Sequence, residues 1–336
     1  MELIYPEFYD RFSDFLRALG GRKIVVLAHS RPDGDCIGSQ IALSRVLQTL
    51  GLDVICANPD PIPRRIKFVV GDTPIVRFEG LPVGDYTAIY VDCADQARAG
   101  EKFKTRFPAP FANIDHHLSN IGYAQHNFID AGSAATAEIL AGLFIDPHLT
   151  IDAQAAQALY TGIATDTGQF RFHSTSRRTF LIVAQLMARG AQPAAAAAEL
   201  YERETAGKLQ LLQRFLASFR HECSGRVCIG TLPEGIYQET GTSAEDTEGL
   251  VDYARSIDGV EMGVLIEQNG GAIKASLRAK DPAYRVDQVA GLFNGGGHAC
   301  AAGLNVKGMT ISEFQDKLVA ALSAQIAAVD AGKKSY

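Results

Sequence analysis

The chain has 336 residues, enough for two domains of ordinary size that each bury a core. Its composition, 47% hydrophobic and 21% charged, is average for a globular protein, and no apolar run reaches the ~18 residues that a membrane span needs. The net charge of −6 excludes a generally basic surface that would attract long nucleic acid, so an anionic substrate would need a local positive site.

The cysteines and the N-terminus bear on the cellular compartment. The six cysteines are scattered and form no C-x-x-C pair: Cys36, Cys56, Cys93, Cys223, Cys228 and Cys300. This usage indicates small buried residues or free thiols in a reducing compartment, so we expect a cytoplasmic location. Residues 1–6 also lack the charged and apolar regions of a signal peptide.

Helix and strand signals alternate through the first half of the chain. Apolar runs predict strands over residues 23–28, 54–57, 87–91 and 111–114, and residues 36–50 have the apolar spacing of a helix that ends at Gly51. This alternation predicts an α/β domain with a mainly parallel sheet and helices on both faces. From Ser133 to about Glu204 the pattern is helical, and the alanine-rich residues 192–199 predict a helix that bridges two domains.

After about Phe219 the pattern changes. Strands are expected over residues 227–232, 260–267 and 272–279, with a hairpin turn at Asn269-Gly270-Gly271, and helices over 243–257, 286–293 and 311–329. This pattern predicts a smaller α+β domain. We therefore expect a first domain over residues 1–190, a helical linker over 191–215 and a second domain over 216–330.

Acidic and histidine side chains follow apolar segments at four places in the first domain. They are His29, Asp33 and Asp35 (H-x-x-x-D-x-D), Asp92, Asp115-His116-His117, and Asp166. The carboxyl ends of parallel strands share one edge of a sheet, so these groups can converge. Carboxylates with a minority of imidazoles favour Mn²⁺ or Mg²⁺ over structural zinc, and their number suits two ions ~3.5–4 Å apart.

A single aspartate at a strand end is more often a helix cap or a turn residue than a metal ligand. The D-H-H and H-x-x-x-D-x-D patterns both occur here, and each lies at the end of a predicted strand. Chance is a poor explanation for that combination.

The motifs resemble those of the DHH phosphoesterase superfamily. The matching segments are His29–Asp35, Val91–Asp95, Ile114–His117, Thr165–Gly168 and Gly295–Gly303. The last is similar to the glycine-rich motif of the DHH-associated C-terminal domain, and the five motifs follow the family's order over nearly the whole chain. Within the superfamily, Thr165–Phe172 with Ser174 and Thr175 is most similar to the bacterial oligoribonuclease/pAp phosphatase (nanoRNase) group.

The resemblance implies two divalent cations, Mn²⁺ first and Mg²⁺ as the alternative. It assigns one ion to His29, Asp33 and Asp92, and the other to Asp35, Asp92, His116 and Asp166, so that Asp92 bridges the two. It also implies that His117 faces the phosphate as a hydrogen-bond donor or proton source, and that Asp115 orients a neighbouring histidine. Cys36 stands where the family pattern has a small residue such as alanine.

Substrate-binding residues are expected in both domains. Gly296 and Gly297 would bring backbone N–H groups close to an anion as a nest, with His298 as a further donor, although glycines there would equally suit a loop tip. Arg278, near a strand end, is the candidate to hold a terminal phosphate with two hydrogen bonds, the alternative being a solvent-exposed charge. Arg98 either shapes the metal site or forms a structural salt bridge.

The implied activity is that of a metal-dependent phosphoesterase that hydrolyses short oligoribonucleotides to mononucleotides and dephosphorylates pAp (3′-phosphoadenosine 5′-phosphate). Two alternatives stay open. One is a phosphodiesterase of linear or cyclic dinucleotides, and the other is a nucleotide-binding regulatory protein without catalysis. The expected partners are short RNA or nucleotides, with no membrane and no long duplex nucleic acid; the residues leave a homodimer open.

Overall fold

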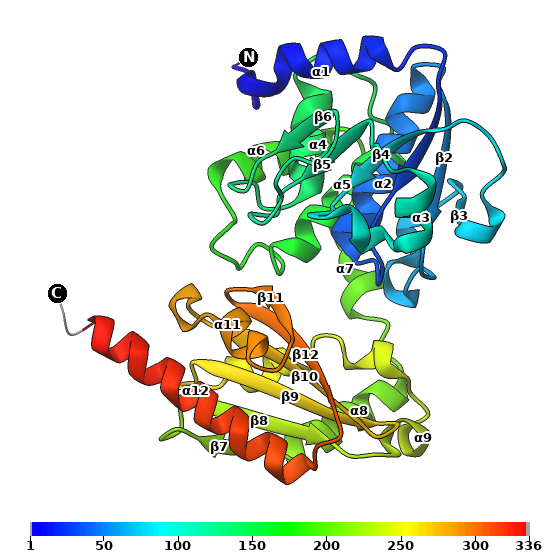
Figure 1. Cartoon of the computed structure of the whole chain (residues 1–336). Coiled ribbons are helices and arrows are strands. Elements are labelled where there is room, and N and C mark those ends of the chain that lie inside the picture. The colour runs from blue at the N-terminus through cyan, green and yellow to red at the C-terminus, as the bar shows by residue number, and fades with distance from the viewer. Residues whose placement is uncertain (1, 334–336) are drawn as a thin grey trace. The chain divides into compact units, whose positions relative to one another are not determined.

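The computed structural model describes residues 2–333, which divide into two compact units, the first ending at Arg203 and the second beginning at Glu204 (Figure 1). Within residues 2–333 the strands form two sheets of six strands each. Among the helices of this range, none combines the length and the apolar character that crossing a bilayer requires.

The first unit is built on a parallel sheet with the strand order β3-β2-β1-β4-β5-β6. Its strands are β1 (Lys23–Leu27), β2 (Asp53–Asn58), β3 (Ile75–Arg77), β4 (Thr87–Val91), β5 (Ala112–Asp115) and β6 (His126–Ile129). Its α-helices are α1 (Pro6–Ala18), α2 (Gly34–Thr49), α3 (Glu101–Arg106), α4 (Thr136–Ile145), α5 (Ala153–Asp166), α6 (Arg177–Ala188) and α7 (Pro193–Tyr201). Short 3₁₀ helices are η1 (Arg64–Val70), η2 (Phe78–Gly80) and η3 (Gln96–Ala99).

Helices cover both faces of this sheet, which explains why its strands are apolar runs rather than alternating patterns. Ile24 and Val26 of β1 face a core shared with α1, α2, α4 and α5. Val25 and Leu27 face the opposite core, which contains Phe103 of α3. The predicted mainly parallel α/β domain with helices on both faces is confirmed.

The second unit is a smaller α+β unit, as predicted, with the strand order β11-β12-β10-β9-β8-β7. Its strands are β7 (Arg220–Glu222), β8 (Val227–Leu232), β9 (Met262–Asn269), β10 (Ala272–Ala279), β11 (Gly296–His298) and β12 (Ala301–Lys307). Its helices are α8 (Ala206–Ala217), α9 (Ile236–Thr240), η4 (Ala244–Thr247), α10 (Leu250–Ser256), η5 (Pro282–Tyr284), α11 (Val286–Gly291) and α12 (Ile311–Lys333).

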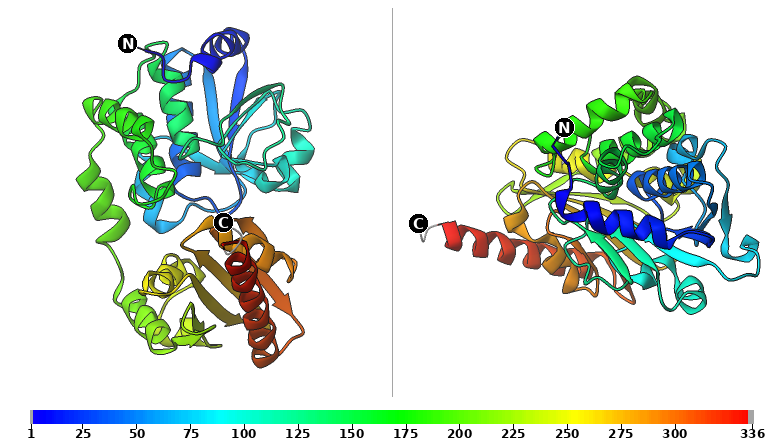
Figure 2. Two further views of the ribbon diagram at one scale, coloured as in Figure 1. Left: turned by 90° about the vertical axis from the view of Figure 1, so that its left-hand side faces the viewer. Right: turned by 90° about the horizontal axis from the view of Figure 1, so that it is seen from above.

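Two cores lie on the two faces of this second sheet. Phe314, Leu318 and Leu322 of α12 pack on one face, where the helix lies along the sheet (Figure 2). Leu211 and Phe215 of α8 lie in the core that also contains residues of α10. Pairing is antiparallel except between β8 and β9, which run parallel.

The segment expected as a helical linker, residues 191–215, contains two helices that pack into different cores. Ala196 and Leu200 of α7 belong to the core of the first unit. Leu211 of α8 belongs to a core of the second.

Some expected elements differ from the structure. The single helix expected over residues 243–257 is wrong, because Gly249 has a left-handed backbone (φ 83°) that separates η4 from α10. The sequence reasoning also missed three helices, α1, α3 and α9, and five strands, β3, β6, β7, β11 and β12. Most of these strands are short or half polar, so they lack the apolar run that identified β1, β4 and β5.

The missed helix α1 is held by an aromatic cluster, so Phe12→Ala should destabilise the first unit. The Phe12 ring is 99% buried and lies 5.6 Å from Phe15 and 5.5 Å from Phe128 between ring centroids. Its removal leaves a cavity and should lower the free energy of unfolding by about 3–5 kcal/mol, measured by urea denaturation. The control Phe180→Ala removes a ring that is 55% exposed and should change stability much less. Equal effects of the two substitutions would contradict this packing.

Candidate metal centre

The site begins where the strand order of the first sheet reverses. β1 and β4 are neighbours, and His29 and Asp92 follow their carboxyl ends. Such switch points are where open α/β sheets bind ligands. Nε2 of His29 lies 3.2 Å from Oδ2 of Asp92. Asp92 has a left-handed backbone (φ 54°), which is uncommon for a residue with a side chain and typical of functional positions.

The N-terminus of α2 brings two more carboxylates to this edge. Asp33 is the N-cap: one oxygen accepts from the N–H of Cys36 at 3.0 Å, and the other lies 3.8 Å from Nε2 of His29. Asp35, in the first helical turn, is completely buried. The partial positive charge of the helix N-terminus favours carboxylates at both positions.

The buried Asp35 is held by a second helix N-terminus. Its two oxygens accept from the backbone N–H groups of Thr136 (2.7 Å) and Ala137 (2.8 Å) at the start of α4. Even so, burial and the charge of Asp92 raise the pKa of Asp35 to about 7. The ionised carboxylate therefore lacks sufficient countercharge.

A second group of ligand atoms forms around His116, which directly follows β5. Nε2 of His116 lies 3.2 Å from Oδ2 of Asp166, 3.7 Å from Oδ1 of Asp92 and 4.0 Å from Oδ2 of Asp35. Asp166 is the last residue of α5, where the helix dipole is unfavourable for an anion. Burial, with the charges of Asp35, Asp33 and Asp92, raises the pKa of Asp166 well above its ordinary value.

The two oxygens of Asp92 face different histidines: Oδ2 contacts His29 and Oδ1 lies near His116. Burial alone would raise the pKa of Asp92, but the hydrogen bond and charge of His29, with His116 and His117, hold it below its ordinary value. Asp92 therefore stays ionised, and it is the one carboxylate that both groups share.

This donor set fits divalent cations. Three groups of side chains offer ligand atoms within 4.8 Å of one another: His29, Cys36 and Asp92; Asp92, His116 and His117; and Asp35, His116 and Asp166. Three buried or partly buried carboxylates repel one another unless a cation lies between them. The structure brings together all six residues that the sequence predicted as metal ligands: His29, Asp33, Asp35, Asp92, His116 and Asp166. It adds Cys36, which the prediction did not include.

Asp115 and His117 form a hydrogen-bonded chain beside this centre. Nδ1 of His117 lies 2.7 Å from Oδ1 of the buried Asp115, and its Nε2 lies 3.1 Å from Nη1 of Arg98. Arginine offers only donors, so Nε2 accepts and Nδ1 carries the ring proton. The predicted role of Asp115 in orienting a histidine agrees with this geometry. In this tautomer Nε2 of His117 accepts a hydrogen bond, and Arg98 is the group that donates it.

Sequence reasoning missed two polar residues that support the site. Thr136 donates through its hydroxyl to Oδ1 of Asp92 at 3.1 Å, in addition to its N–H bond to Asp35. Asn120 donates to Oδ2 of Asp115 at 2.6 Å. Neither lies in a recognisable motif, and β6, which leads toward Thr136, was itself not predicted. Such partners orient the groups that bind a metal or substrate.

A buried ion pair also supports the loop before α4. Nε of Arg178 lies 2.9 Å from Oε1 of the completely buried Glu138, and its Nη2 donates to Asp130 at 2.7 Å. Asp130 accepts from the hydroxyl of Ser133 at 2.7 Å. The carbonyl oxygen of Ser133 lies 3.4 Å from Nδ1 of His116, so this network helps to set the orientation of the imidazole.

In the second unit, the pairing of β10 and β11 with β12 places two of the predicted substrate-binding residues in one row across the sheet. Arg278 of β10 and His298 of β11 both lie opposite Ala301 of β12, so they share one row and one face of the sheet. Arg278 is half-buried, and burial lowers its pKa.

The glycine triplet leads into a strand where the sequence suggested an anion-binding loop. Gly296 and Gly297 belong to the edge strand β11, where they pair with Gly303 and Ala302. A Cβ on Gly297 would meet the carbonyl oxygen of Ala301 at 2.3 Å, so this glycine allows close approach of β12. Contact of Gly296, Gly297 and His298 with substrate stays a prediction.

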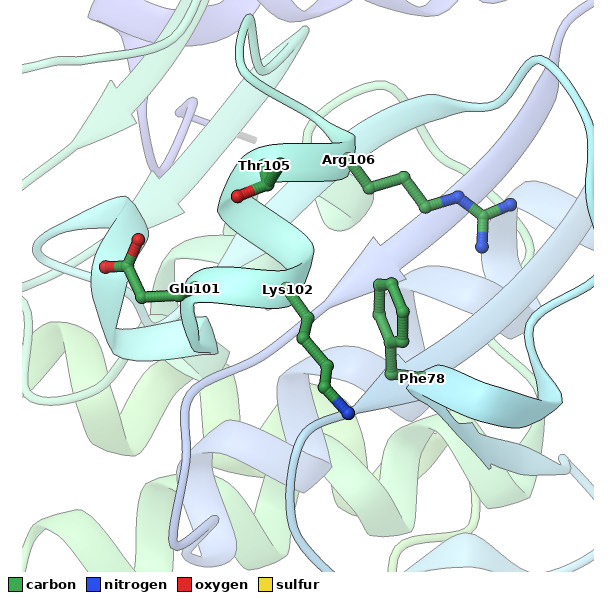
Figure 3. A pocket seen from close by; sticks show the side chains of 5 residues that line it. All are labelled: Phe78, Glu101, Lys102, Thr105 and Arg106. Atoms are coloured by element: carbon green, nitrogen blue, oxygen red, sulfur yellow. The ribbon is translucent and has the colours of Figure 1, made fainter.

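A surface hollow of about 430 Å³ lies elsewhere on the first unit. Figure 3 shows its lining side chains: Phe78, Glu101, Lys102, Thr105 and Arg106. Lys102 pairs with Glu79 at 2.6 Å, and Arg106 donates to the carbonyl of Leu81 at 3.2 Å. Its cations already have partners in the chain, so the hollow lacks the chemistry of the acidic edge.

Fold and site together define a two-domain α/β protein with a cluster of carboxylates and histidines that fits divalent cations. Residues 23–163 match the DHH family, N-terminal domain, and residues 225–328 match the DHHA1 domain. The chain belongs to the DHH family, which confirms the resemblance read from the motifs.

Relatives of known name cover nearly the whole chain. The bifunctional oligoribonuclease and PAP phosphatase NrnA of Thermus thermophilus is 28% identical over 96% of this chain and 96% of its own length. The protein of the same name from Bacillus subtilis is 26% identical over 84% of this chain and 89% of its own length.

Solved structures share the fold. An exopolyphosphatase-related protein from Bacteroides fragilis has a TM-score of 0.87 at 23% identity, covering 96% of this chain and 98% of its own. Exonuclease RecJ bound to manganese has a TM-score of 0.51 at 15% identity, covering 96% and 95%.

Repulsion at the site predicts that Asp166→Asn stabilises the metal-free protein. A carboxyl whose pKa is raised by folding destabilises the fold at pH values above its unfolded pKa of about 3.9. In chelator at neutral pH the free energy of unfolding should rise by more than about 1 kcal/mol, measured by urea denaturation. The gain should shrink as the pH falls toward the unfolded pKa and vanish below about pH 3, where the carboxyl is protonated in both states.

Asp10→Asn, at an exposed position of α1, is the control and should leave stability unchanged. Equal stability of Asp166→Asn and the parent protein at neutral pH would contradict the repulsion.

Proposed function

We propose that this protein is a metal-dependent phosphoesterase that hydrolyses short oligoribonucleotides to mononucleotides and dephosphorylates pAp. The observation that carries the proposal is the convergence of six carboxylate and imidazole side chains on one edge of the sheet, where Asp92 lies beside both His29 and His116. The names of the Thermus and Bacillus relatives support the choice of substrates.

The residues proposed to hold the cations form two sets that share Asp92. One is His29, Asp33 and Asp92, and the other is Asp35, Asp92, His116 and Asp166. Two divalent ions bound there would supply an activated water and neutralise charge on phosphate oxygens. Oxygen-rich ligands with a minority of imidazoles suit Mn²⁺, with Mg²⁺ as the alternative.

Arg98 and His117 are proposed to hold the scissile phosphate. The guanidinium of Arg98 keeps N–H groups beyond the one that donates to His117, and these suit a phosphate oxygen. Asp115 and Asn120 fix the ring of His117 from behind. Displacement of Arg98 toward the phosphate would leave Nε2 of His117 able to take a proton from solvent. The imidazolium could then deliver this proton to the leaving oxygen, a step typically worth ~10²–10⁴ in rate.

The second unit is proposed to bind the remainder of the substrate. Arg278 and His298 lie in one row across β10, β12 and β11, and a guanidinium can hold a terminal phosphate with two hydrogen bonds. This arrangement favours short substrates with a free phosphate end. A cytoplasmic location and a homodimer stay predictions.

Asp92→Ala tests the proposed activity. Purified protein with Mn²⁺ should release mononucleotide from an end-labelled dinucleotide and phosphate from pAp. The substitution removes a ligand from both ions, so turnover should fall by at least about a hundredfold and bound metal should decrease. Asp258→Ala, at an exposed carboxylate, is the control and should keep both. Near-normal turnover of Asp92→Ala would exclude the two-ion assignment, and no turnover by the parent protein across several metals would exclude the activity.

Arg278→Ala tests the substrate-binding role of the second unit. Loss of a charge-assisted contact worth about 1.5–3 kcal/mol should raise KM for pAp roughly tenfold or more, with a smaller change in kcat. Lys307→Ala, at an exposed position of β12, should leave KM unchanged. An unchanged KM in Arg278→Ala would leave Arg278 with a structural role only.

A further inference from the structure

We propose that Cys36 is a ligand of one of the two ions, so that this position has a mixed nitrogen, oxygen and sulfur donor set. The inference rests on the proposed metal centre and goes beyond it. Cys36, His29 and Asp92 are all buried and offer ligand atoms within 4.8 Å of one another.

The position of Cys36 in α2 explains why its sulfur reaches this group. Its backbone N–H donates to Oδ1 of the N-cap Asp33 at 3.0 Å, while the other oxygen of Asp33 lies near His29. The sulfur of Cys36 also lies within 4.8 Å of a ring nitrogen of His29. One residue therefore holds a ligand carboxylate through its backbone and joins the ligand group through its side chain.

Cys56 is a buried cysteine of the same unit that does not lie beside the proposed metal ligands. It is equally buried on β2, but its sulfur lies 3.8 Å from the carbonyl oxygen of Gln40, and it belongs to none of the three groups of ligand atoms. Burial alone therefore does not bring a cysteine to a ligand group, whereas the place of Cys36 on the first turn of α2 does.

A sulfur ligand changes which ion this position prefers. Soft thiolate ligands favour Zn²⁺, Co²⁺ and Fe²⁺, whereas carboxylates suit Mg²⁺ and Mn²⁺. The group of Asp35, His116 and Asp166 contains no sulfur, so the two positions should differ in metal preference. As the sulfur–metal bond forms, the thiol proton passes to solvent.

Co²⁺ spectroscopy of the full-length, metal-stripped protein tests the assignment. Ligand-field bands report Co²⁺ bound by any ligands, whereas a thiolate-to-Co²⁺ charge-transfer band in the near ultraviolet requires a sulfur ligand. The parent protein and Cys56→Ala should show both features. Cys36→Ala and Cys36→Ser should keep the ligand-field bands and lose the charge-transfer band. By calorimetry, their preference for Zn²⁺ over Mn²⁺ should fall at least about tenfold.

The outcomes separate this inference from the proposed function. Ligand-field bands without a charge-transfer band in the parent protein would overturn the role of Cys36 and leave the metal centre intact. A charge-transfer band that persists in both Cys36 variants would also overturn it. Absence of any Co²⁺ spectrum in folded parent protein, checked by circular dichroism, would overturn the metal centre and the Cys36 ligand together.

Discussion

Electrostatic repulsion among Asp35, Asp92 and Asp166 is the constraint on which the rest of the site depends. Two of these carboxylates are almost completely buried, and the groups around them only partly compensate their charge. Backbone N–H groups of α4 hold Asp35, and His29 and His116 contact Asp92. The metal-free protein therefore folds despite the electrostatic repulsion within this cluster of carboxylates. A divalent cation bound there would reduce that repulsion.

The sheet topology brings residues from distant parts of the chain together in this cluster. Because the strand order reverses between β1 and β4, the segments after these strands leave in opposite directions and keep the edge between them open. The N-termini of α2 and α4 then supply positive partial charge, and the C-terminus of α5 adds Asp166. Thr136 and Asn120 restrict the orientations of Asp92 and Asp115, which preorganises the site.

The sequence predicted the parts of this arrangement that depend on local pattern. β1, β4 and β5 are apolar runs buried on both faces, so their ends, and the acids and histidines that follow, could be located. The remaining features depend on tertiary contacts, which the local sequence pattern does not show. β6 is half polar and escaped detection, and with it the role of Thr136. The glycines at 295–297 suggested an anion-binding loop, but Gly296 and Gly297 pair with β12 as part of the edge strand β11. In the sequence Cys36 was only a departure from the family pattern, and its place beside His29 and Asp92 became visible in the structure.

The central claim is that this edge of the sheet binds two divalent ions that share Asp92. Equilibrium binding of Mn²⁺ to the metal-stripped protein, followed by electron paramagnetic resonance, tests it most directly. We expect two Mn²⁺ per chain and a spectrum of exchange-coupled ions, because a bridging carboxylate would place them ~3.5–4 Å apart. A single Mn²⁺ per chain, or two ions with the spectrum of isolated Mn²⁺, would contradict it.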